Sequence, residues 1–213
     1  TSEDMTNAKF PWLKCKEIII ADKKVRALRI NYLGELGWEL HLPFIDMEFL
    51  YDKLMQAGEK YNISNFGTYA VNSLRLEKAY KGWGSELTGE ISLAESRMNK
   101  FFNLSKKDKF IGSQALKKIL KTGIKIKIVY LEVITEDADC LGNEPVYYDD
   151  KIVGVVTSGS YGFRVKKSLA FAYVLSELAE TAKEFQIKIL GKMKKGIVLN
   201  QMAFDPENSR LIS

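Results

Sequence analysis

Apolar and polar residues alternate along two short segments near the start of the chain, and this alternation predicts two strands. Leu28, Ile30 and Tyr32 share one face of the segment 26–32. Residues 38–42 follow the same rule, with Trp38, Leu40 and Leu42 alternating with Glu39 and His41. Gly34 and Gly37 lie between the segments and allow the backbone angles of a tight reversal. The pattern therefore predicts a β-hairpin in which Glu39 points away from the face that carries Trp38.

A different periodicity follows the hairpin. Residues 46–61 place Met47, Leu50, Tyr51, Leu54 and Met55 at helical spacing, so we expect a helix there, with Asp46 able to cap it. Residues 73–78 alternate Leu74 and Leu76 with charged neighbours, which favours a strand. A further helix is expected at 112–121, ended by Gly123.

From residue 124 onward the chain consists of short alternating segments separated by turns. The expected strands are 124–134, 145–148, 152–156, 169–174, 184–190 and 197–202. Six short strands suit a small closed barrel or a sandwich. The predicted fold class is therefore α+β, with an α+β region at 1–104, a connecting helix within 105–123 and an all-β barrel at 124–213.

Composition narrows the possible functions. The chain has 213 residues and 46% hydrophobic content, enough for a full core, and no apolar run approaches the ~18 residues of a membrane span. The 32 basic residues are interspersed with 27 acidic ones, so the net charge of +5 does not indicate a nucleic-acid partner. Cys15 and Cys140 lie far apart and suggest no disulfide framework, so we expect a reducing, cytoplasmic compartment.

Several catalytic classes are disfavoured. His41 is the single histidine, which argues against a catalytic triad and excludes a metal site built from several histidines. Gly82-Trp-Gly84 is followed by Leu87 where a dinucleotide fingerprint needs glycine, so we expect no flavin or nicotinamide site. Gly191-Lys192 lacks the hydroxyl residue of a phosphate loop. We predict no metal.

The hairpin remains the best candidate for binding. A carboxylate such as Glu39 accepts two parallel N–H bonds, as a guanidinium or the amino-pyrimidinone edge of a pterin offers, and Tyr32 has a ring for stacking. The alternative is that Glu39 is a solvated strand residue, that Trp38 belongs to the core and that the glycines only form a turn.

Several spaced motifs together resemble a known family. The motifs are Tyr32-Leu-Gly-Glu-Leu-Gly-Trp-Glu39, Asn65-Phe-Gly-Thr-Tyr-Ala70, Asn72-Ser-Leu-Arg-Leu-Glu-Lys78, Gly82-Trp-Gly84, Phe110-Ile-Gly112, Gly142-Asn-Glu144, Thr157-Ser-Gly-Ser-Tyr161 and Lys167-Ser-Leu-Ala-Phe-Ala-Tyr173. In this order they resemble the folate-binding aminomethyltransferase fold of the glycine-cleavage T-protein. More specifically, they look like the C-terminal folate region of the dimethylglycine and sarcosine dehydrogenases. It runs over nearly all of the chain.

The resemblance implies a partial folate-binding domain followed by the family's terminal barrel, with tetrahydrofolate as the cofactor. Tyr32 and Glu39 match the family positions that contact the pterin. Glu35 belongs to the same candidate site, although its place nearer the turn favours a role in shaping the hairpin. Trp83 is a further candidate for lining the folate channel, the alternative being a buried packing role. Thr157–Tyr161 is either a loop over the site or a strand end whose hydroxyls bond nearby backbone.

Departures from the family pattern limit what is carried over. Val71 stands where the glycine-cleavage enzymes have an arginine for the folate tail, and Arg97 replaces the glycine of Pro-x-Glu-Ala-Gly-Leu. Arg75 is expected to be a structural, salt-bridged residue rather than a ligand contact. The family's catalytic aspartate corresponds to a position before Thr1 and the flavin domain lies earlier still, so we expect a fragment with no catalytic residue of its own, inactive alone, with FAD bound only in the missing part.

The resemblance thus predicts a function within a larger enzyme. The parent would oxidise an N-methylated glycine at a flavin and pass the carbon to tetrahydrofolate in the region represented by this chain. The expected partners are folate, an N-methylated amine and the N-terminal portion of the same protein, with no nucleic acid and no membrane. Alternatives are a flavin-free aminomethyltransferase or folate-dependent demethylase, and a non-catalytic structural module.

Overall fold

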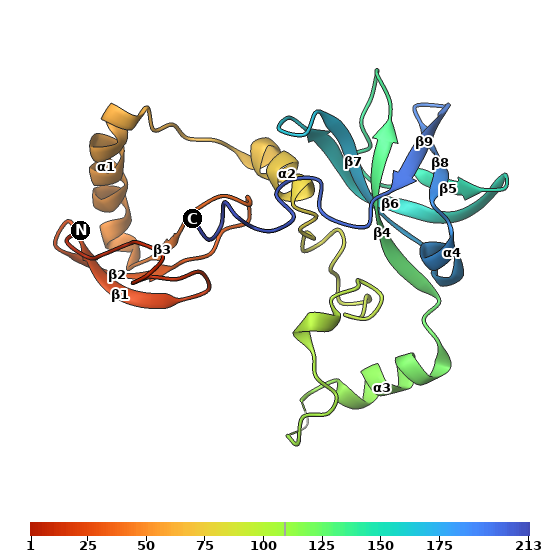
Figure 1. The fold of residues 1–213 in the computed structure, drawn as a ribbon, viewed down its shortest axis with the longest axis horizontal. Coiled ribbons are helices and arrows are strands. Elements are labelled where there is room, and N and C mark those ends of the chain that lie inside the picture. Colours follow the sequence, from red (N-terminus) through yellow and green to blue (C-terminus); the bar gives the residue numbers. More distant parts are fainter. Residues whose placement is uncertain (109) are drawn as a thin grey trace. The chain divides into compact units, whose positions relative to one another are not determined.

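The computed structural model describes residues 1–108 and 110–213 (Figure 1). Two compact units are present, and each is described by itself. The first comprises Thr1–Lys78 together with Phe204–Ser213, and the second comprises Ala79–Ala203. The last ten residues of the chain therefore pack with its first part, although the sequence pattern of residues 124–213 gave no sign of a return.

An antiparallel sheet of three strands organises the first unit. The strands are β1 (Cys15–Ile20), β2 (Lys23–Leu28) and β3 (Glu39–His41), in that order across the sheet. Arg26 lies opposite His41 and Leu28 opposite Glu39, so the predicted pairing of these segments is confirmed. The predicted tight turn is wrong, because residues 29–38 form a long loop between β2 and β3. We did not predict β1.

The buried face of β2 also differs from the prediction. Val25 and Ala27 are fully buried, and Arg29 continues the same face just after the strand, whereas Tyr32 is 38% exposed. A shift of one residue moves every side chain of a strand to the other face. The apolar alternation of Leu28, Ile30 and Tyr32 indicated the wrong face because it belongs largely to the loop, where no ladder fixes the direction of the side chains.

Helices complete the first unit. They are η1 (Phe44–Asp46), α1 (Met47–Gly58), η2 (Glu59–Tyr61) and α2 (Thr68–Glu77). The predicted helix over 46–61 is confirmed, although Asp46 makes no capping bond and pairs with Lys23 at 2.5 Å. The predicted strand over 73–78 is wrong: most of it is the end of α2, where Ser73, Leu76 and Glu77 are buried together at helical spacing. Burial of polar residues hid that period in the sequence.

Two fully buried cations hold the C-terminal segment against the first unit. Lys78 Nζ donates to the main-chain oxygen of Asp205 at 2.7 Å and to Asn208 Oδ1 at 2.9 Å. Arg29 Nη2 donates to the main-chain oxygens of Leu211 at 3.3 Å and Ser213 at 2.9 Å. A buried cation without acceptors is costly, so these bonds bind the end of the chain to the sheet and α2.

Gly34 lies directly on the stem of Lys78. Its φ is +77°, in the left-handed region, and a Cβ at this position would come 2.2 Å from Lys78 Cγ. The Lys78 side chain is fully buried and bonded at its end, so it has little freedom to move aside. Gly37 has no positive φ, and a Cβ there would meet its nearest neighbour, Asn31, at 3.5 Å.

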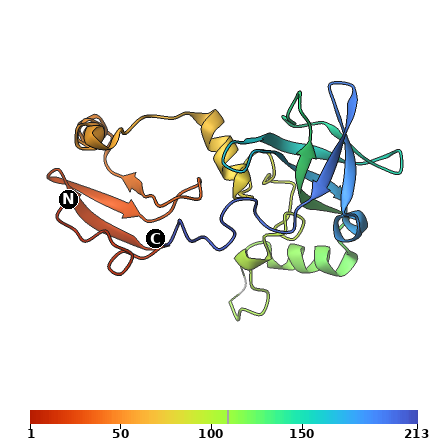
Figure 2. The same ribbon diagram turned by 45° about the horizontal axis from the view of Figure 1, so that its top comes forward.

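The second unit contains a closed six-stranded barrel (Figure 2). Around the barrel the order is β4-β7-β6-β5-β8-β9, and β4 pairs with β9 to close it. The strands are β4 (Ile126–Ile134), β5 (Pro145–Tyr148), β6 (Lys151–Gly162), β7 (Lys167–Leu175), β8 (Glu184–Ile189) and β9 (Lys192–Val198). The fold class, α+β followed by a small barrel, is confirmed.

Most predicted barrel strands match within a few residues, and β5 matches at both ends. β9 begins five residues earlier than predicted, because its first residues are lysine-rich and largely exposed and show no apolar alternation. The unit also contains η3 (Asn99–Phe101), α3 (Ser113–Thr122) and α4 (Ser176–Thr181). The predicted helix at 112–121 is confirmed as α3, and Gly123 ends it with a φ of +92°.

A buried carboxylate attaches the turn Gly82–Glu86 to the barrel. Glu86 Oε1 accepts hydrogen bonds from the hydroxyls of Thr157 and Ser158, each at 2.6 Å. Glu86 Oε2 accepts from the Gly82 amide at 2.7 Å, and the Glu86 main-chain oxygen accepts from the Tyr173 hydroxyl at 2.8 Å. Thr157–Tyr161 thus lies inside β6, and two of its hydroxyls bond a side chain rather than only nearby backbone.

We predict that Gly34→Ala lowers the free energy of unfolding by about 2–4 kcal/mol, combining left-handed strain with overpacking against Lys78. Urea denaturation followed by circular dichroism measures the change. Gly37→Ala is the matched control, with an expected loss below about 1 kcal/mol. Equal losses in the two variants would contradict the close packing of Gly34 on Lys78.

A second prediction concerns Glu86. In Glu86→Gln an amide N–H group must replace one carboxylate oxygen and face a donor, at a cost of about 1–3 kcal/mol. Thermal unfolding of this variant is compared with that of Glu90→Gln, an exposed site where a change within about 0.5 kcal/mol is expected. Unchanged stability of Glu86→Gln would show that the turn does not depend on this carboxylate.

Candidate functional site

The loop that carries Tyr32 is built around the side chain of Asn31. Asn31 Oδ1 accepts hydrogen bonds from the amides of Leu33 at 2.8 Å and Gly34 at 2.9 Å, while its Nδ2 donates to the main-chain oxygen of Glu35. Asparagine side chains commonly form such turns by replacing a backbone acceptor. Leu33 to Glu35 are therefore fixed locally, directly after Tyr32, a residue that is 38% exposed.

Glu39 is the first residue of β3 and points outward from the sheet. Half of its side chain is exposed, and its Oε2 lies 3.3 Å from Nε2 of His41. On the other face, Trp38 and Leu40 pack against the buried cluster of Phe10, Ile18 and Ala27. The predicted separation of Glu39 from Trp38 is thus observed, and the carboxylate is accessible from solvent.

Glu35 is joined to the C-terminal segment. Its Oε2 lies 3.3 Å from Nε of Arg210, and both side chains are more than a third exposed. Its main-chain oxygen is bonded to Asn31. These contacts give Glu35 a role in shaping the loop. Glu35 and Tyr32 therefore lie in the same short, ordered segment.

Trp83 belongs to the second unit and is 83% exposed. The alternative of a buried packing role is therefore wrong. The flanking Gly84 has a φ of +88°, and its amide donates to the main-chain oxygen of Leu87 at 2.8 Å. This turn presents the indole outward, while Glu86 fixes its base to the barrel.

Sequence reasoning missed two charged residues around this turn, Lys81 and Glu86. Lys81 is largely buried with its Nζ 5.5 Å from the centre of the Phe171 ring, and burial lowers the pKa of its ammonium, against the opposing effect of Glu86. Burial likewise raises the pKa of the Tyr173 hydroxyl, and the charge of Glu86 adds to this. The signal that could have identified Lys81 and Glu86 in the sequence is the presence of charged residues on both sides of Gly82-Trp-Gly84.

The two arginines noted in the sequence have structural partners. Arg75 is buried, and its Nε and Nη2 both donate to Asn72 Oδ1, at 2.9 and 2.6 Å. Arg97 has a φ of +54°, a conformation that glycine adopts freely, and its Nη2 donates to the main-chain oxygen of Ala179 at 2.7 Å. Arg97 thus adopts a backbone conformation that favours glycine, the residue of the family pattern at this position.

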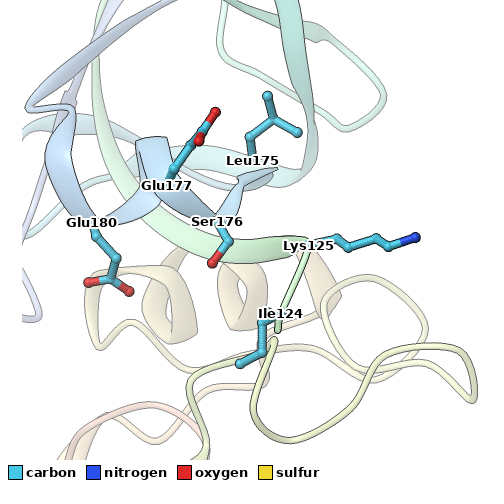
Figure 3. A pocket seen from close by; sticks show the side chains of 6 residues that line it. All are labelled: Ile124, Lys125, Leu175, Ser176, Glu177 and Glu180. Carbon is cyan, nitrogen blue, oxygen red and sulfur yellow. The ribbon is translucent and has the colours of Figure 1, made fainter. Parts of the chain in front are cut away.

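Two of the hollows on the described surface lie on the second unit. One, of about 390 Å³, is lined by Ile124, Lys125, Leu175, Ser176, Glu177 and Glu180 where α4 begins (Figure 3). The other, of about 270 Å³, is lined by Ile134, Thr135, Glu136, Asp137 and Lys194. Neither is lined by Tyr32, Glu35, Glu39 or Trp83.

The described residues form neither a metal cluster nor a membrane-spanning helix. Over 1–108 and 110–213, no cluster of three histidine, cysteine or acidic side chains has the arrangement of a metal site. None of the helices in the described part of the chain is long and apolar enough to cross a membrane.

Two family models match the chain in sequence order. Residues 1–106 match the GCVT N-terminal domain, and residues 127–205 match the glycine cleavage T-protein C-terminal barrel domain. The second match contains all but the first residue of the six barrel strands. The family resemblance drawn from the spaced motifs is confirmed.

Individual relatives agree with the models. Dimethylglycine dehydrogenase of Rattus norvegicus is 43% identical over 99% of this chain and 25% of its own length. Sarcosine dehydrogenase of Mus musculus is 30% identical over 98% of this chain and 23% of its own length. Aminomethyltransferase T of Bartonella henselae has the same fold, with a TM-score of 0.76 and 24% identity over 85% of this chain and 50% of its own. The chain thus spans about a quarter of either dehydrogenase.

These relatives also correct the expected compartment. Both dehydrogenases are mitochondrial, so the cytoplasmic prediction was wrong. The absence of a disulfide pattern indicates a reducing compartment. It does not distinguish one reducing compartment from another. With both domain models matched in order and the dehydrogenases aligned along nearly the whole chain, the protein belongs to the glycine cleavage T-protein family and is similar to the corresponding region of the dimethylglycine and sarcosine dehydrogenases.

Proposed function

We propose that the chain is the tetrahydrofolate-binding region of a dimethylglycine or sarcosine dehydrogenase-like flavoprotein. In this role it receives the oxidised N-methyl carbon on folate. The observation that carries the proposal is the outward carboxylate of Glu39 beside a preformed loop bearing Tyr32, in a chain that aligns with these dehydrogenases over nearly its full length.

The chemistry of Glu39 suits a pterin. Its carboxylate is half exposed, and among the described residues it contacts His41 at 3.3 Å. It can exchange that weak contact for two parallel N–H donors. Charge-assisted pairs of this kind are about twice as strong as neutral hydrogen bonds. The amino-pyrimidinone edge of a pterin offers two such donors in one plane.

Tyr32 supplies the second element of recognition. Its ring is partly exposed and follows directly on Asn31, whose side chain fixes the next residues of the loop. A preordered aromatic ring can stack on a flat ligand with little loss of conformational freedom. When bound, tetrahydrofolate supplies the amine nitrogen that accepts the one-carbon unit, and this chain binds and orients it.

The substrate side of the reaction belongs to the parent protein. We propose that a flavin in the parent oxidises the N-methylated glycine and that the carbon then meets folate held by this region, which raises its effective concentration. A flavin-free aminomethyltransferase is the second candidate, because residues 1–106 and 127–205 match the two domains of the glycine cleavage T-protein. Formation of methylene-tetrahydrofolate from dimethylglycine or sarcosine by the full-length protein distinguishes the two.

The test of folate binding is Glu39→Ala in the full-length protein. Loss of a charged acceptor should weaken binding of 5-formyltetrahydrofolate by about 1.5–3 kcal/mol, as measured by calorimetric titration. Glu17→Ala is the matched control, because Glu17 also carries an exposed carboxylate on the same sheet, paired there with Lys24. Unchanged affinity in Glu39→Ala would refute the proposed pterin contact.

A further inference from the structure

The C-terminal segment Phe204–Ser213, here called the strap, contacts the Tyr32 loop through Lys78. The Lys78 stem lies against Gly34, and its Nζ donates to the strap at Asp205 O and Asn208 Oδ1. The side chain is fully buried. The position of Gly34 thus depends on a lysine whose charged end is fixed by residues 127 and 130 positions away.

Two further contacts join the strap to the loop. Arg29 is the first residue of the loop, and its Nη2 donates to main-chain oxygens of Leu211 and Ser213. Glu35 pairs with Arg210 at 3.3 Å. The strap therefore contacts the loop directly at Arg29 and Glu35, and it acts on Gly34 only through Lys78.

The strap has a defined shape of its own. Asp205 Oδ1 accepts from the amide and hydroxyl of Ser209, at 3.0 and 2.6 Å, and Oδ2 accepts from the Arg210 amide at 3.0 Å. The Phe204 amide donates to the main-chain oxygen of Glu77 at 2.9 Å, next to Lys78. These bonds present the acceptors of Lys78 in a fixed arrangement.

We propose that the strap is a positioning element for the folate site: through Lys78 and Arg29 it holds the loop 29–38 in the conformation that presents Tyr32 and Glu39 to the pterin. The inference rests on the folate-binding function proposed above. Removing a strap acceptor should loosen the loop and weaken folate binding, although no strap residue is assigned a contact with the ligand.

Asn208 is the residue to change. Its φ is +59°, so Asn208→Gly permits the same backbone conformation while removing the side chain with its Oδ1 acceptor, whereas Asn208→Asp keeps an acceptor. Asn143→Gly in the second unit is the matched control, because Asn143 has a φ of +70°. The variants are made in the full-length protein, and amide hydrogen exchange and affinity for 5-formyltetrahydrofolate are measured.

Asn208→Gly should speed exchange at the amides of Leu33 and Gly34 and weaken binding roughly three- to tenfold, the effect of one hydrogen bond. Asn208→Asp and Asn143→Gly should resemble the wild type in both measurements. Unchanged exchange in Asn208→Gly, or faster exchange with unchanged affinity, would overturn the positioning role. A wild-type protein that binds no folate would instead refute the proposed function, while the exchange result would still decide whether the strap holds the loop.

Discussion

The first unit depends on the pairing of two buried cations with the end of the chain. Arg29 and Lys78 are almost completely buried, and burial of a charge is tolerated only where acceptors surround it. Their acceptors include main-chain oxygens between residues 205 and 213, more than 120 positions away from either cation. The sheet, the end of α2 and the strap are therefore stable together rather than separately.

This constraint also explains the form of the candidate site. Arg29 starts the loop between β2 and β3, and the stem of Lys78 supports Gly34 within it. The side chain of Asn31 adds hydrogen bonds that order the loop locally, and the hydrophobic pattern of the sequence does not predict them. A long loop supported in this way can present Tyr32 and Glu39 with little motion.

Sequence patterns predicted the barrel well because its strands alternate regularly and end at turns. The same reasoning failed for α2, where buried polar residues such as Ser73 and Glu77 replace the expected apolar stripe. It also failed for the buried face of β2, since Arg29 reads as a solvated residue until its distant acceptors are known. Periodicity reports which positions are apolar, and these elements bury charges instead.

The candidate site was predicted partly by chemistry and partly by family resemblance. Glu39 and Tyr32 follow from the hairpin pattern and the motif together, whereas the exposure of Trp83 and the burial of Glu86 near Lys81 do not. The hydroxyl partners of Glu86 come from β6, about 70 residues later in the chain, which no local pattern reveals. Long-range polar contacts are thus the part of the structure that the sequence pattern concealed.

The most direct test of the site is a crystal structure of the full-length protein with 5-formyltetrahydrofolate. We expect the amino-pyrimidinone edge of the pterin within hydrogen-bonding distance of the Glu39 carboxylate, the pterin ring against Tyr32, and the bonds from Lys78 to the strap intact. A pterin bound elsewhere, with Glu39 still directed at His41, would contradict the assignment of this loop as the folate site.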